Sequence, residues 1–105
     1  MSTVSTHVLD TALGKPAAEI ALTLARGGNV IASGTTDADG RFRDPGAHEP
    51  GNYQLTFAVG AYFDAAGRDS FYGEVVIRFR ITSASEHYHV PLLLSPFGYS
   101  TYRGS

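Results

Sequence analysis

Histidine, arginine, tyrosine and hydroxyl side chains gather in three stretches of this sequence of 105 residues. The first contains His7, and the second begins at Arg41, directly after a glycine. The third runs from residue 87 to the end and contains His-Tyr-His and, at 102–105, Tyr-Arg-Gly-Ser. Histidine binds or releases a proton near neutral pH, so these residue types fit acid–base chemistry or the binding of a small ligand.

His87 and His89 are predicted to share one face of a strand, because side chains at i and i+2 point the same way and lie roughly 7 Å apart. At that distance they can converge on one small molecule. The same pattern is common in metal sites, and zinc would require a third ligand such as His7. The structural alternative is that these histidines only form hydrogen bonds on a half-buried strand. Spacing alone leaves the alternatives open.

Strands are predicted to position these residues. β-Branched and apolar residues alternate over short segments that are separated by Gly, Pro, Asn and Asp turns. The expected strands cover residues 3–10, 20–25, 30–36, 41–43, 53–59, 75–81, 87–95 and 99–103. The alternation breaks at residues 61–67, where we expect a short helix with Gly67 as its C-cap. Short strands with turn signals about every 8 to 12 residues predict an all-β sandwich.

Some candidates also have a purely structural interpretation. His7 would lie with Ser5 on the face opposite the apolar residues of its strand, either at the surface or in a site. Arg41 begins a strand after a predicted turn, where an exposed arginine is either a ligand-binding residue or merely solvated. Arg103 is either a site residue or the partner in an ion pair. His48 lies in a polar loop, and no role is expected for it.

We expect a single domain that covers residues 1–105. Its composition excludes several classes of function. The net charge is −2 and the eight basic residues are scattered, which does not give the basic stripe that nucleic acid requires. No apolar run approaches the roughly eighteen residues of a membrane span. The absence of cysteine excludes disulfides and thiolate sites. The N-terminus lacks the features of a signal peptide, and we expect a soluble, cytoplasmic protein.

Two motifs resemble the transthyretin superfamily. His-Val-Leu-Asp at 7–10 followed by Gly-Lys-Pro-Ala at 14–17 resembles its opening, and Tyr-Ser-Thr-Tyr-Arg-Gly-Ser at 99–105 is similar to the ending of its enzymatic branch, the 5-hydroxyisourate hydrolases. Two further stretches fit the same family, Asp-Gly-Arg at 39–41 and the run at 87–95. The resemblance covers essentially the whole chain, and the hormone carriers lack the Tyr-Arg-Gly-Ser ending.

The resemblance implies a sandwich of two four-stranded sheets, with one short helix between strands five and six. It implies a homotetramer with active sites in a channel between pairs of dimers. The implied reaction is the opening of a small molecule, 5-hydroxyisourate, by water to give 2-oxo-4-hydroxy-4-carboxy-5-ureidoimidazoline. This step follows urate oxidation in purine breakdown. No cofactor and no metal ligand are expected.

The resemblance also assigns roles to residues of this chain. Catalytic roles are expected for His7, Arg41, His89 and Ser105, and substrate contacts for His7, Arg41, Tyr102, Arg103, Gly104 and Ser105. His7 and His89 would orient and deprotonate the water, with no choice made between them. Arg41 would donate hydrogen bonds to substrate carbonyls and to developing charge. Ser105, through its hydroxyl or the terminal carboxylate, would hold substrate or water together with Tyr102.

Two other functions are weighed against the hydrolase. A non-enzymatic carrier would bind an aromatic small molecule in the same tetramer channel, and a zinc-binding module would use His7, His87 and His89. The carrier is disfavoured because carriers of this superfamily have a lysine where His7 stands. Zinc would bind adventitiously at clustered histidines, without being required for turnover. His87 is expected to be a supporting residue.

Overall fold

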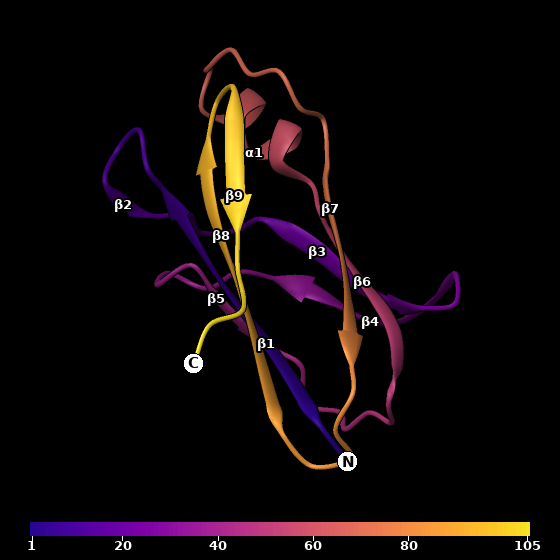
Figure 1. Cartoon of the computed structure of the whole chain (residues 1–105). Helices are drawn as coiled ribbons and strands as arrows, with labels where there is room; N and C mark the ends of the chain where they lie inside the picture. The colour runs from indigo at the N-terminus through magenta and orange to yellow at the C-terminus, as the bar shows by residue number, and fades with distance from the viewer.

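The computed structural model describes residues 1–105 as two β-sheets that enclose one core, with one short helix (Figure 1). The strands are β1 (Thr3–Asp10), β2 (Lys15–Pro16), β3 (Ala21–Arg26), β4 (Asn29–Thr35), β5 (Arg41–Arg43), β6 (Gly51–Phe57), β7 (Val75–Ile81), β8 (His87–Ser95) and β9 (Gly98–Thr101). The helix α1 (Val59–Ala65) lies between β6 and β7. The predicted sandwich and the place of its helix are confirmed.

The two sheets differ slightly from the expected pair of four-stranded sheets. One sheet has the order β4-β3-β6-β7, and the other has the order β2-β1-β8-β9 with β5 also paired to β1. The fifth strand of that sheet is β2, where a turn was expected. After Gly14, which has a φ of 69°, the chain doubles back and pairs for two residues with the end of β1. Because β5 pairs with Ser5 to His7, β2 and β5 share one edge of β1.

The parallel pairing of β1 with β8 joins the two ends of the sequence. It runs without interruption from Thr3 opposite His87 to Asp10 opposite Leu94. Buried and half-buried residues alternate along β1, and the half-buried ones face outward. On β8, Tyr88 is buried, whereas the flanking histidines are exposed or half-buried. The structure therefore places the outward residues of both strands on one sheet face.

The core is a single cluster of 18 buried residues contributed by both sheets and the helix. The helix begins at Val59, two residues before the predicted segment 61–67, and buries Val59 and Phe63. Alternation assigned Val59 to the preceding strand because it is buried in either conformation. Gly67 follows the helix with a φ of 65°, as expected for a residue that ends a helix. With seven residues, α1 is too short to cross a membrane, and no other helix is present.

A buried carboxylate ties the segment around α1 to β1. Asp10 is fully buried and accepts hydrogen bonds from Arg68 Nη1 at 2.7 Å, Tyr62 Oη at 2.8 Å and the Leu13 N–H at 3.1 Å. Burial alone would raise the pKa of Asp10. The hydrogen bonds and the positive charge of Arg68 outweigh burial, so the pKa lies below its usual range.

Asp10→Ala is expected to lower the free energy of unfolding by about 3 kcal/mol at neutral pH, the low end for breaking a buried pair because Arg68 is partly exposed. A lowered folded pKa contributes stability above the unfolded pKa, and this is lost as pH falls through the folded pKa. Urea denaturation should therefore show a smaller difference near pH 2. Asp69→Ala removes an exposed carboxylate nearby and should change stability by less than ~0.5 kcal/mol. Equal stabilities of the two variants would contradict this role.

Candidate active site

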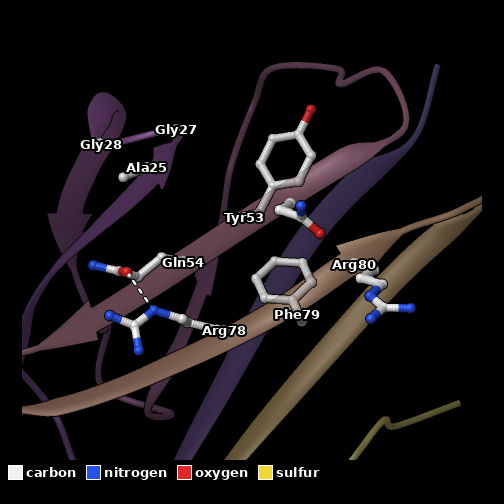
Figure 2. Close-up of a pocket in the computed structure, with 9 residues that line it drawn as sticks. Ala25, Gly27, Gly28, Tyr53, Gln54, Arg78, Phe79 and Arg80 are labelled. Atoms are coloured by element: carbon white, nitrogen blue, oxygen red, sulfur yellow. Dashed lines mark hydrogen bonds between the residues drawn. The ribbon is translucent and has the colours of Figure 1, made fainter.

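One surface hollow, of about 440 Å³, lies over the sheet that contains β6 and β7 (Figure 2). Tyr53 and Phe79 stack there with ring centroids 6.1 Å apart, and Arg78 Nε donates to Gln54 Oε1 at 3.2 Å. No histidine, aspartate or glutamate lines this hollow. It therefore lacks a side chain that could act as a general base near neutral pH.

A second hollow, of about 320 Å³, lies over the opposite sheet, where β5, β1 and β8 meet. Its lining consists of Ser5, Thr6, Arg41, Phe42, Arg43, His87, His89 and Ser105. It thus brings together three of the four residues for which catalytic roles were expected. The fourth, His7, pairs directly with Arg41 across β1 and β5. This hollow is the candidate active site.

A tight turn fixes the start of the strand that carries Arg41. The Asp37 carboxylate accepts the N–H groups of Asp39 and Arg41, both at 2.9 Å. Gly40 has a φ of 74°, and a Cβ at this position would lie 2.4 Å from the Val8 carbonyl oxygen. Only glycine therefore lets the turn lie against β1, where the Val8 N–H donates to the Gly40 carbonyl at 2.7 Å. The turn brings Arg41 beside the outer face of β1.

Register places His7 and His89 close together. Ser5 pairs with His89 across β1 and β8, and His7 is the next outward residue of β1, opposite Pro91. The two histidines are thus diagonal neighbours on adjacent parallel strands, and the strand spacing and two residues of rise separate their backbones by roughly 8 Å, which long side chains can bridge. Both are half-buried. A small substrate over this face could contact both rings.

Hydroxyl groups connect the two histidines of β8. Thr3 Oγ1 lies 2.6 Å from His87 Nδ1, and Ser5 Oγ lies 2.7 Å from His87 Nε2 and 2.8 Å from His89 Nδ1. Both ring nitrogens of His87 are therefore occupied. His89 Nε2 makes no hydrogen bond within the chain, so it is available to a ligand in the hollow.

The site favours neutral histidines. Burial lowers the pKa of His89, and the positive charge of Arg41 lowers it further, with smaller contributions from His87 and His7. Burial and the charge of Arg43 lower the pKa of His87. At neutral pH both rings are therefore uncharged, and His89 can accept a proton. Sequence reasoning missed Arg43, although strand alternation places it on the same face as Arg41.

The C-terminal tail crosses the ring of His89. The Gly104 N–H donates to the His89 carbonyl at 2.8 Å, which extends the contact between tail and β8 beyond β9. A Cβ on Gly104 would lie 2.5 Å from His89 Cδ2, so a larger residue would collide with the ring. Ser105 then reaches the lining of the site. In Figure 1 the yellow terminal segment correspondingly bends away from β9 toward β5.

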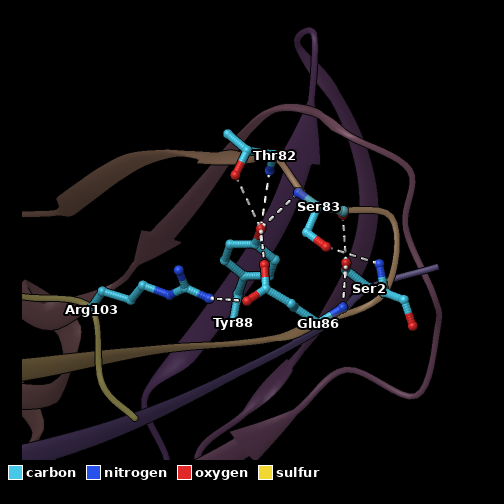
Figure 3. A network of polar contacts seen from close by, with 7 residues as sticks. Ser2, Thr82, Ser83, Glu86, Tyr88 and Arg103 are labelled. Carbon is cyan, nitrogen blue, oxygen red and sulfur yellow. Dashed lines mark hydrogen bonds and ion pairs between the residues drawn. The ribbon is translucent and has the colours of Figure 1, made fainter.

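Tyr102 and Arg103 do not join this group within the single chain. Figure 3 shows Arg103 directed toward Glu86, with Nη2 3.5 Å from Oε1, and its guanidinium carbon lies 4.4 Å from the ring centroid of Tyr88. Tyr102 is 57% exposed and lines a separate groove with Arg103 beside β7. The tail thus sends successive residues to different sides of β8. Its last two residues reach the site.

The remaining histidine belongs to a different cluster. His48 Nε2 contacts Asp44 Oδ2 in the loop after β5, and both side chains are largely buried. The loop residue for which no role was expected therefore has a structural partner. No group of three or more histidine, cysteine, aspartate or glutamate side chains is arranged to hold a metal ion.

Comparison with known proteins matches the whole chain to one family. The model of the HIUase/Transthyretin family matches residues 4–104. The 5-hydroxyisourate hydrolase of Caulobacter vibrioides is 44% identical over 115 residues, which cover 100% of both chains. The 5-hydroxyisourate hydrolase of Salmonella dublin is 43% identical over 109 residues, which cover 97% of this chain and 80% of that protein.

Solved structures agree with the sequence comparison. The 5-hydroxyisourate hydrolase of Klebsiella pneumoniae superposes with a TM-score of 0.94 at 42% identity, over 100% of both chains. Sea bream transthyretin in complex with thyroxine superposes with a TM-score of 0.90 at 31% identity, over 96% of this chain and 93% of that one. The chain therefore belongs to the HIUase/transthyretin family.

Proposed function

We propose that this protein hydrolyses 5-hydroxyisourate to 2-oxo-4-hydroxy-4-carboxy-5-ureidoimidazoline. The observation that carries the proposal is that Arg41, His89 and Ser105 line one hollow, with His7 paired to Arg41 across β1 and β5 and with His89 neutral under the charge of Arg41. Relatives named for this activity cover the full length of the chain. The cytoplasmic location expected from the sequence stays a prediction.

The site residues can supply each part of a ring-opening hydrolysis. His89 in its neutral form, or His7, accepts a proton from water as the water oxygen bonds to a ring carbonyl carbon. Arg41 donates hydrogen bonds to the carbonyl oxygen as negative charge develops there. The carbon–nitrogen bond of the ring then breaks, and the proton returns to the leaving nitrogen. Ser105, which also lines the hollow, orients the water or the substrate.

A homotetramer is part of the same proposal. In the single chain the site is an open hollow on an outer sheet face, and Tyr102, for which a substrate contact was expected, is exposed elsewhere. Assembly around this face would enclose the hollow and exclude water from it. Light scattering that gave the 11.2 kDa of one chain, at the concentration used for activity, would contradict the tetramer.

The second candidate is a carrier, which the similarity to sea bream transthyretin with bound thyroxine favours. An activity assay separates the two. 5-Hydroxyisourate is generated in place from urate with urate oxidase, and its ultraviolet decay is followed with and without the protein, in the presence of EDTA. We expect decay faster than the spontaneous rate. An unchanged rate would overturn the hydrolase, and acceleration that EDTA abolishes would indicate a metal enzyme instead.

A further inference from the structure

A continuous row of hydrogen-bonding groups leads away from the site. It passes from His89 to Ser5, from Ser5 to His87, and from His87 to Thr3, and its three contacts are 2.8, 2.7 and 2.6 Å long. His89 lies at the hollow, whereas His87 is exposed and Thr3 is half-exposed at the other end. The proposed hydrolysis requires a proton to leave the water and later to return. That mechanism uses only the residues at the hollow and assigns no role to this row of hydrogen-bonding groups.

The chemistry of Ser5 couples the two rings. A serine hydroxyl carries one proton and accepts through its lone pairs, so between two neutral imidazoles it donates to one ring and accepts from the other. If His89 Nδ1–H donates to Ser5, then Ser5 donates to His87 Nε2, and His87 Nδ1–H donates to Thr3. His89 Nε2 then carries a lone pair and is a base. If every bond in the row reverses, His89 Nε2 carries a proton and is an acid.

We propose that Ser5, His87 and Thr3 form a proton path that sets the tautomer of His89 and exchanges its proton with solvent. This inference deepens the proposed hydrolase and rests on it. A water proton binds His89 Nε2, and the Nδ1 proton moves to Ser5 Oγ. The Ser5 proton moves to His87 Nε2, the His87 Nδ1 proton moves to Thr3 Oγ1, and the Thr3 proton passes to solvent. The reverse sequence supplies the proton for the leaving nitrogen.

The charges around His89 explain why a proton would leave this ring along the path. Arg41 and Arg43 line the site from β5, Ser105 lines it from the tail, and His7 lies beside Arg41 on β1. Burial and the charge of Arg41 make an imidazolium at His89 unfavourable, and burial and the charge of Arg43 do the same at His87. Passing the proton through Thr3 to solvent removes the positive charge from both rings without moving any heavy atom. Ser5 and His87 are thus positioning residues, since neither needs to touch the substrate.

Ring ¹⁵N chemical shifts test the tautomer directly and do not depend on turnover. In protein labelled at histidine, Ser5→Ala should shift the His89 Nδ1 and Nε2 signals, because the partner of Nδ1 is lost. Ser5→Thr keeps the hydroxyl and should restore them. Ser33→Ala, which removes an exposed serine on the other sheet, is the control. Unchanged His89 shifts in Ser5→Ala would overturn the path.

Kinetics test the transfer of protons. Ser5→Ala should lower kcat by at least ~10-fold with little change in KM, and Ser5→Thr should recover most of it. In mixtures of H₂O and D₂O, wild-type kcat should depend on the deuterium fraction along a curve, because several protons move together, whereas Ser5→Ala should give a line. A linear dependence in the wild type would overturn the transfer. Coupled shifts without any turnover would support the row and overturn the hydrolase.

Discussion

His89→Ala is expected to lower kcat/KM for 5-hydroxyisourate by at least ~100-fold, the low end of the contribution of a general acid–base group. The variant removes the ring whose Nε2 is available in the hollow, and it leaves the buried side of β8 intact. His7→Ala should have an effect of similar size, because His7 lies on the same face beside Arg41. Steady-state kinetics with 5-hydroxyisourate generated in place measures both losses.

The pH dependence of the wild type provides an independent check. Because burial and Arg41 lower the pKa of His89, the ring is deprotonated at neutral pH. We expect kcat/KM to be constant through neutral pH and to fall only as the pH drops through this lowered pKa. His48→Ala changes a histidine outside the site and should retain the activity of each folded molecule. Near-normal activity of both site variants would show that the reaction occurs elsewhere.

Deletion of residues 102–105 is expected to abolish activity while the fold is retained. The deleted residues contribute nothing to the buried core, and the Arg103–Glu86 ion pair is exposed, so its loss costs less than ~1 kcal/mol. The site loses Ser105 and the hydrogen bond from Gly104 to His89. Far-ultraviolet circular dichroism and the urea midpoint check the fold, and the decay of 5-hydroxyisourate checks the activity. Near-normal turnover would exclude a role for Ser105.

A single substitution examines the tail with less disturbance. Gly104→Ala places a Cβ 2.5 Å from His89 Cδ2, so either the ring or the tail must move. We expect kcat to fall while the urea midpoint stays close to that of the wild type. Gly73→Ala is a suitable control for a glycine exchange, because its Cβ would meet nothing within 4 Å and its φ is not positive.

The alternation of apolar and polar residues is a property of local sequence, so it predicted the features of the fold that local sequence decides. It placed His7, His87 and His89 on outward faces, because burial of alternate apolar residues decides which way each strand faces. It could not separate a strand from a helix at Val59, since an apolar residue is buried in both. Alternation also did not predict the two-residue strand β2, because its pairing with the end of β1 is decided by the neighbouring strand.

The row from Thr3 to His89 depends on register between distant segments. Ser5 lies between two histidines only because β1 pairs with β8 in parallel, with Ser5 opposite His89. The residues near Ser5 in the sequence do not predict that His89 lies opposite it. The course of the tail is similar, since Gly104 reaches the site through a contact with His89 that tertiary packing creates. Arg43, in contrast, could have been predicted as a site residue from the alternation of its own strand, because it lies on the same face as Arg41.

The pairing of β1 with β8 also determines when the site can form. Thr3 pairs with His87, 84 residues later, so the chain closes a long loop before these strands gain any contact. Sheet topologies dominated by such distant pairs fold in milliseconds to seconds rather than microseconds. During synthesis β1 emerges before β8 and has no partner on that edge until β8 has left the ribosome. The site therefore assembles only after β8 has been made, and β1 must be kept from pairing with other chains until then.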